Sequence, residues 1–183
     1  MPGVRLIERG CFPSCPDMVW FPQRRRARST VMPESGTNSR DLILEAFARI
    51  VRNADDLSCK GLGPAEAAFC RVMWLEASVD NGGFAAFFCS SHGDFASETL
   101  EALSRIGASD AASLLREAIA LFGPTGPSRD PVARAEELSH LKPGAGLKLS
   151  KLDEAFYSQE EALDLLKIRF LRSAGLVAPG PAA

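Results

Sequence analysis

DNGGFAAFFCSSHGD, residues 80–94, contains the strongest local signals for how this chain folds. It follows a long apolar run with helical spacing, and the paired Gly82 and Gly83 predict a sharp stop of that helix, because glycine enters left-handed backbone conformations at little cost. Phe84 and Phe88 then lie four residues apart, which places both rings on one face of a new short helix. The stretch therefore predicts two helical segments joined by a bend, with phenylalanines buried just after it.

The polar residues around the bend are predicted to hold the backbone of the bend by hydrogen bonds. Glu76 lies one turn before the glycines, and its carboxylate is predicted to accept hydrogen bonds from the free amides that open the short helix. Gly93 is predicted to close the short helix and Asp94 to cap the next one. A binding pocket is the alternative. The motif comprises Glu76, Asn81, Gly82, Gly83, Phe84, Phe88, Ser91, Gly93 and Asp94.

Helical periodicity continues on both sides of this motif. Asn38 or Ser39 is predicted to cap the first helix, and Gly63-Pro64 to open the second, because proline is tolerated in a first turn. The second helix, through about Val79, is apolar on nearly every side, which indicates a buried central helix. Asp94 and Ser109 are predicted to cap the next two helices, the first of which is predicted to stop at Gly107. Later helices are predicted to begin at Asp130-Pro131, about Leu149, and a Ser158–Glu161 capping box. No alternating strand pattern interrupts them, so the prediction is an all-α, compact single-domain bundle of seven to eight helices.

Composition limits the class of protein. The 183 residues (19.7 kDa) suit one domain. No apolar run approaches the roughly 20 residues of a membrane span, and the N-terminus lacks a secretory pattern. The five cysteines form no regular framework, which favours free thiols and a cytoplasmic location.

Charge divides the chain unevenly. Residues 1–40 hold seven arginines against three acids, a balance of +4, whereas residues 41–183 hold fourteen basic and twenty acidic residues, a balance of −6. Residues 1–38, with several prolines and the run RRRAR, are predicted to be a disordered basic leader. Residues 39–173 form the predicted domain, and 174–183 a flexible Gly/Pro/Ala tail. The acidic balance of the folded part argues against direct binding of nucleic acid.

The motif also resembles the signature, NGGF…F…SxGD, of a bacterial family of DNA-mimic proteins and their uncharacterised relatives. Matching positions downstream are Ala102-Leu103, 106–108, Ala118, Phe122, Arg134, Leu152-Asp153, Phe156-Tyr157 and Leu163. The resemblance spans about residues 41–172. It implies an all-α fold and, for the members with a role, binding to a DNA-binding transcription regulator in place of DNA. Phe87 departs from the family pattern, which commonly has tyrosine there.

A DNA mimic must present carboxylates at something like phosphate spacing, because duplex DNA carries about one charge per ~1.7 Å. Glu98 and Glu101 share one predicted helix face, and Glu160 and Asp164 another. A solvated surface is the alternative for each acid. The candidates for binding a partner are Asp94, Glu98, Glu101, Asp153, Glu160 and Asp164.

Catalysis has one candidate pair, Cys89 and His92, in which imidazole would activate a thiolate. No orienting or oxyanion pattern accompanies it, so an enzyme is disfavoured. A metal site or cofactor is not expected, since the only histidines are His92 and His140. The leading hypothesis is a non-catalytic protein-binding module that mimics DNA toward a regulator, without a membrane role. An immunity protein that sequesters a toxin is an alternative, and a homodimer stays open.

Overall fold

The computed structural model describes residues 39–54 and 58–178, and in these ranges it contains seven α-helices, one 3₁₀-helix and no strand. The predicted all-α fold is therefore confirmed. The elements in chain order are α1 (Ser39–Val51), α2 (Pro64–Cys89), η1 (Ser91–Phe95), α3 (Ala96–Ile106), α4 (Ser109–Ala120), α5 (Pro131–Ser139), α6 (Ala145–Tyr157) and α7 (Glu160–Ser173).

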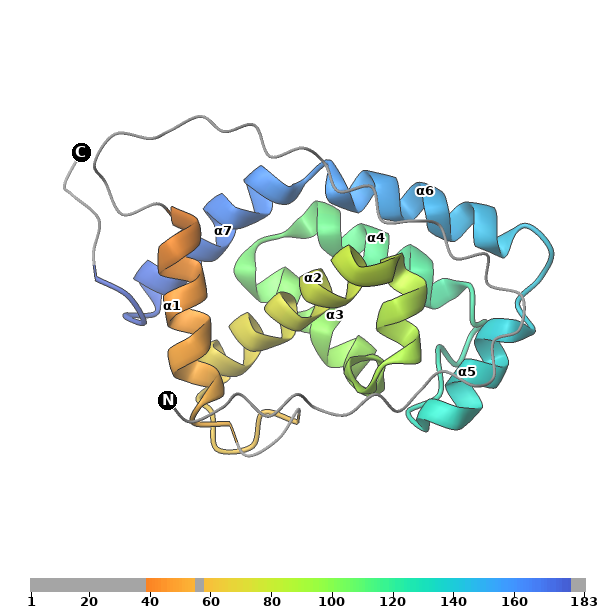
Figure 1. Ribbon diagram of the computed structural model, residues 1–183, viewed down its shortest axis with the longest axis horizontal. Helices are drawn as coiled ribbons and strands as arrows, with labels where there is room; N and C mark the ends of the chain where they lie inside the picture. Colours follow the sequence, from red (N-terminus) through yellow and green to blue (C-terminus); the bar gives the residue numbers. More distant parts are fainter. Residues whose placement is uncertain (1–38, 55–57, 179–183) are drawn as a thin grey trace, which may run out of the picture.

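Helix α2 is the centre of the structure, as the sequence predicts. It runs through the middle of the molecule (Figure 1) and packs against α1, α3, α5, α6 and η1. Pro64 occupies its first turn, and the Glu66 carboxylate accepts a hydrogen bond from the Gly63 amide at 2.9 Å. Such a bond satisfies one of the amides that a helix start leaves unpaired. No helix of the described residues is long and apolar enough to cross a bilayer.

The bend predicted at the paired glycines is present inside α2. Gly82 has φ 175° and ψ 32°, and Gly83 has φ 72° and ψ −173°, so the helix breaks there and resumes at Phe84. The rings that follow the break, Phe84, Phe87 and Phe88, have 0 % exposure. Burying a phenylalanine side chain contributes about 1.5–3 kcal/mol. The bend thus places these three rings in the core.

Two groups of buried side chains form the core, and α2 contributes to both. The larger group joins residues along most of α2 to α3, α4 and α6, and includes Leu103, Leu115 and Phe156. The smaller group joins the first half of α2 to α1 and α7, and includes Ile43 and Leu171. Helices α1 and α7 therefore pack together against the first half of α2.

Two of the predicted helix ends are confirmed. Gly107 ends α3 in the left-handed conformation, with φ 86°. Asp130 caps α5, and its carboxylate accepts a hydrogen bond from the Ala133 amide at 2.8 Å. Both ends follow from residue types whose local preferences are strong.

Three of the predicted caps are wrong. Asp94 lies inside η1, and α3 begins after Phe95 without a side-chain cap. Ser109 is already the first residue of α4. Before α7, the Ser158 hydroxyl donates to the Ala155 carbonyl at 2.7 Å instead of capping the helix. In each case another hydrogen-bonding partner or an earlier helix start takes precedence over the local pattern.

The domain limits remain predictions. The candidate cap Asn38, the leader (1–38) and residues 179–183 lie outside the described residues. Packing extends beyond the predicted domain end at 173, because Leu176 and Val177 contact the smaller core group. The Arg49 guanidinium also donates to the Leu176 carbonyl. Residues 174–178 therefore pack against the helices.

Candidate functional site

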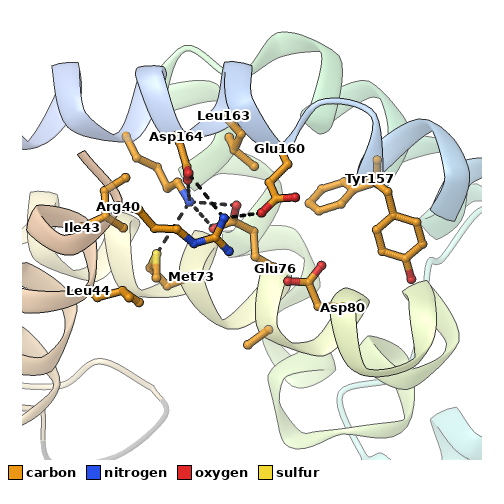
Figure 2. Close-up of a pocket in the computed structure, with 13 residues that line it drawn as sticks. Arg40, Ile43, Leu44, Met73, Glu76, Asp80, Tyr157, Glu160, Leu163 and Asp164 are labelled. Carbon is orange, nitrogen blue, oxygen red and sulfur yellow. Dashed lines mark hydrogen bonds and ion pairs between the residues drawn. The ribbon is translucent and has the colours of Figure 1, made fainter. Parts of the chain in front are cut away.

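A cavity of about 180 Å³ lies between α1, α2 and the α6–α7 junction. We call it the charged hollow and define it by its six charged lining residues, Arg40, Glu76, Asp80, Glu160, Asp164 and Lys167. Figure 2 shows the charged side chains that it labels, from α1, α2 and α7, converging on one region, with the apolar Ile43, Leu44 and Met73 beside them. The hollow thus combines apolar walls with a cluster of charges.

Helical spacing explains why these charges meet. Glu76 and Asp80 are four residues apart on α2, so they share one face of that helix. On α7, Glu160, Asp164 and Lys167 recur at intervals of four and three, which also places them on one face. The two faces lie toward each other in Figure 2, and the first turn of α1 adds Arg40.

Lys167 forms the buried part of this network, with a side chain only 3 % exposed. Its ammonium nitrogen lies 2.6 and 2.8 Å from the two carboxylate oxygens of Glu76, and 2.7 Å from Asp164 Oδ1. An ammonium group has three N–H donors, and the Lys167 ammonium therefore has one carboxylate oxygen within hydrogen-bond distance for each donor. A buried ion requires such compensation, because removing charge from water is unfavourable by several kcal/mol.

Arg40 forms the exposed part. Its guanidinium donates to Glu160 Oε1 and lies 4.0 Å from Asp164 Oδ2. The side chains of Arg40 and Glu160 are 53 % and 55 % exposed, so solvent screens this pair strongly. The hydrogen bond to Glu160 raises the pKa of Arg40, and the charges of Glu160 and Asp164 act in the same direction.

The hollow has a negative balance, since four carboxylates face two cations. Burial raises the pKa of Glu76, although the Lys167 charge acts against that shift. Burial also raises the pKa of Asp80, and the neighbouring Glu160 carboxylate adds to it. A further cation entering the hollow would oppose both shifts, because an opposite charge favours the ionised carboxylate.

The motif at the bend is held by Asp153, a contact that the sequence does not reveal. The amide of Phe84, which opens the second segment of α2, donates to Asp153 Oδ1 at 2.8 Å. The prediction that Glu76 would accept this bond is therefore wrong, and Glu76 pairs with Lys167 instead. Gly83 allows the approach, since a Cβ built there would lie 2.3 Å from Asp153 Oδ2. Asp153, a predicted partner-binding acid, is half-buried at this contact, and burial raises its pKa.

Two other residues of this region lie at the bend. The Tyr157 hydroxyl donates to the Val79 carbonyl at 2.7 Å, on the turn that the break deprives of helical partners. Asn81 is exposed, and its side-chain amide donates to the Ala77 carbonyl at 2.7 Å. Helix α6 therefore holds the bend from one side through Asp153 and Tyr157.

The second half of the motif surrounds Arg134, a fully buried arginine on α5 with 0 % exposure. Its guanidinium donates to the carbonyls of Phe88 (2.6 Å), Ser90 (2.9 Å) and Ser128 (2.6 Å), and to Asp94 Oδ1 at 2.6 Å. Asp94, the predicted cap and partner-binding acid, therefore serves as the counter-ion of a buried cation.

Gly93 and Ser91 lie beside this contact. A Cβ at Gly93 would come within 2.8 Å of Arg134 Nε and 2.9 Å of the Phe87 carbonyl. The absence of a side chain at Gly93 therefore permits the close approach of Arg134. Ser91 begins η1 and is exposed.

The predicted acids Glu98 and Glu101 lie on α3. Glu98 Oε1 pairs with Arg129 at 2.6 Å, and Glu101 is exposed. The structure therefore divides the six predicted partner-binding acids. Asp94, Glu98 and Glu101 belong to η1 and α3, whereas Glu160 and Asp164 line the charged hollow and Asp153 holds the bend.

The candidate pair for thiol chemistry lies at the end of α2 and in η1. The Nδ1 atom of His92 lies 3.0 Å from the Ser78 hydroxyl, and its ring stacks on Trp74 with centroids 5.5 Å apart. Burial lowers the pKa of His92. These contacts hold the imidazole against α2. Cys89 is half-buried. Among the described residues, no group of three or more His, Cys, Asp or Glu side chains is arranged to hold a metal ion.

The sequence does not reveal the roles of three residues that organise these contacts, Arg40, Arg134 and Lys167. Lys167 carries one usable signal, since it continues the spacing of Glu160 and Asp164 on a helix that is otherwise apolar on that side. Arg40 lies at the start of the predicted domain, next to the basic leader. Its place in the first turn of a predicted helix was the available signal.

A comparison with known protein families gives a match over most of the helical part of the chain. The family model described as DMP19-like protein matches residues 60–174. This range contains α2 to α7, and with them every charged residue of the hollow except Arg40, which lies before it on α1. No curated protein and no solved structure matches the chain significantly.

Proposed function

The chain belongs to the DMP19-like protein family, a family of DNA mimics, and on that premise we propose that it is a non-catalytic module that occupies the DNA-binding surface of a transcription regulator. The family is not a known enzyme family. A protein partner is implied by the family's DNA-mimic character, because a mimic acts by contacting a protein that binds DNA.

The observation that carries the proposal is the charged hollow. Four carboxylates from two packed helices gather there against only two cations. Asp80 is exposed, and Glu160 is exposed even though its carboxylate accepts a hydrogen bond from Arg40, so a protein surface that is shaped for phosphates can reach both. A rigid arrangement matters because complementary charges add to affinity when they need not be reorganised on binding.

The acids of η1 and α3 are less suited to this role. Asp94 is the counter-ion of the buried Arg134, and Glu98 pairs with Arg129. Glu101 is left as the one predicted acid of this group without an ion pair among the described residues. That group therefore has a balance of −1, against −2 in the hollow, and we place the partner-binding surface at the hollow.

The test is affinity capture with the full chain as bait, followed by mass spectrometry of the captured proteins. We expect a protein that binds duplex DNA, and we expect duplex DNA to displace the bait. Capture should weaken steeply as salt rises, because the captured protein would bind this chain, like duplex DNA, through opposite charges that salt screens. Enrichment of a protein that duplex DNA does not displace would contradict the proposal, and enrichment of a toxin would favour the inhibitor alternative.

Variants locate the surface. Asp80→Asn combined with Glu160→Gln should reduce capture of the same protein, because two exposed charges of the hollow are lost. Glu98→Gln combined with Glu101→Gln removes the same charge from α3 and serves as the matched control. Equal losses in the two double variants would place the surface elsewhere.

A further inference from the structure

We propose that the charged hollow is a seat for an arginine side chain of the partner protein, and that Arg40 occupies this seat in the unbound chain. This inference rests on the proposed function and deepens it, since it names the chemical group that the hollow recognises. A displacement follows from it: the partner's arginine replaces Arg40 against Glu160 and Asp164.

The seat already holds a guanidinium in the structure. Arg40 extends from the first turn of α1 toward α7, where it donates to Glu160 and lies 4.0 Å from Asp164 (Figure 2). Two carboxylates from one helix face thus converge on one planar cation. Guanidinium is the cation best suited to such contacts, because it presents its donors in a fixed fork.

The two cations of the hollow differ in how readily they can leave. Lys167 is 3 % exposed and lies within 2.8 Å of Glu76 and Asp164, so its removal would leave buried carboxylates uncompensated. Arg40 is 53 % exposed and pairs with a carboxylate that is 55 % exposed. Exposed pairs contribute little to stability. Arg40 is therefore the cation that can be exchanged.

The walls also suit an arginine. Met73, Ile43 and Leu44 line the cavity beside the carboxylates, and Leu44 is 50 % exposed. The methylene groups of an arginine can lie along such apolar surface while the guanidinium reaches the charged groups. Asp80 adds a fourth, exposed carboxylate on the α2 side of the cavity.

The carboxylates of the proposed arginine site lie inside the residues that match the family, and Arg40 lies outside them. Glu76, Asp80, Glu160, Asp164 and Lys167 lie inside the matched residues 60–174, whereas Arg40 lies on α1, outside them. The carboxylates therefore belong to the family region of the chain. Arg40 belongs to α1, which lies outside the matched residues.

The experiment uses the full chain and a fluorescein-labelled tetra-arginine peptide, with binding followed by fluorescence anisotropy at about 0.15 M salt. Arg40→Gln should bind the peptide about two- to fivefold more tightly than the unmodified chain, the range expected for losing one exposed competing pair. Arg169→Gln is the matched control, because it removes the same charge from an exposed position on α7. Equal gains in both variants would overturn the proposal, since they would reflect overall charge alone.

A second set of variants tests the carboxylates. In the Arg40→Gln background, Asp80→Asn with Glu160→Gln should abolish the gain, whereas Glu101→Gln with Glu136→Gln should weaken binding only as far as overall charge requires. For the unmodified chain, amide resonances of residues 80, 157 and 160 should shift on peptide addition. Shifts confined to other parts of the chain would overturn the seat without any variant being needed.

The seat and the proposed function can fail separately. If the peptide binds in the hollow but the captured partner does not bind DNA, the proposed function is wrong and the seat stands. If a captured DNA-binding regulator binds the unmodified chain and Arg40→Gln equally well, the seat is wrong and the function stands.

Discussion

Replacing Gly83 with alanine tests how the bend in α2 is held. Gly83 has φ 72° and ψ −173°, a conformation that residues with a side chain rarely adopt. An added Cβ would lie 2.3 Å from Asp153 Oδ2 and 2.6 Å from its Cγ. Asp153 must therefore move, and the hydrogen bond from the Phe84 amide at 2.8 Å is lost.

The expected loss of unfolding free energy in Gly83→Ala has two parts. The backbone conformation alone costs about 1–3 kcal/mol for a residue other than glycine. Loss of the hydrogen bond from the Phe84 amide to the charged Asp153 removes about 1.5–3 kcal/mol more. We expect Gly83→Ala to lower the free energy of unfolding by about 3–5 kcal/mol, a large fraction of the 5–15 kcal/mol typical of a domain.

Equilibrium unfolding in urea, followed by far-UV circular dichroism, measures this change. Gly107→Ala is the matched control, because Gly107 has φ 86° but its Cβ would meet nothing within 4 Å. It should therefore lose only about 1–2 kcal/mol. Asp153→Ala completes a double-mutant cycle, in which Gly83→Ala should be less harmful once the carboxylate is gone.

A loss at Gly83 no larger than at Gly107 would refute the steric argument. Additive effects of Gly83→Ala and Asp153→Ala would refute it independently, because the two residues would then act without contact.

Three further predictions concern buried polar groups. Lys167→Met should lower the free energy of unfolding by about 3–5 kcal/mol, since it leaves Glu76 uncompensated, and adding Glu76→Gln should restore part of the loss in the same urea assay. Arg134→Lys should lower it by about 2–4 kcal/mol, because an ammonium cannot reproduce the guanidinium contacts with three carbonyls and Asp94; thermal melting would show this, and an unchanged midpoint would contradict the assigned role. Burial lowers the pKa of His92, so its contribution to stability is present above its unfolded pKa of about 6.5 and is lost as pH falls through the lower folded value. The chain should therefore lose stability relative to His92→Gln between pH 7 and pH 5, and parallel pH profiles would contradict this.

The local part of the structure was predictable from the sequence. The bend at Gly82 and Gly83, the stop at Gly107 and the cap at Asp130 each depend on the preferences of a few adjacent residues. The burial of Phe84 and Phe88 follows from their helical spacing. Such features appear in a single sequence because the interactions that produce them span only one or two turns.

The contacts that organise the candidate site were not predictable in this way. Asp153 is 69 residues from the Phe84 amide that it accepts from, and Lys167 is 91 residues from Glu76. Each pairing depends on how α6 and α7 pack on α2, so no local pattern identifies it. Glu76 illustrates the difficulty. Its closeness to the bend along the chain favours the prediction that it accepts hydrogen bonds there, but the packing of the helices places Lys167 beside it instead.

We propose that the charged hollow binds a transcription regulator at the surface where that regulator binds DNA. The most direct measurement is displacement of labelled duplex DNA from the captured regulator by the full chain. We expect the unmodified chain to displace DNA completely and the double variant Asp80→Asn with Glu160→Gln to lose this displacement, while Glu101→Gln with Glu136→Gln displaces DNA nearly as well. A regulator that holds DNA and this chain at the same time would show that the chain does not occupy the DNA-binding surface.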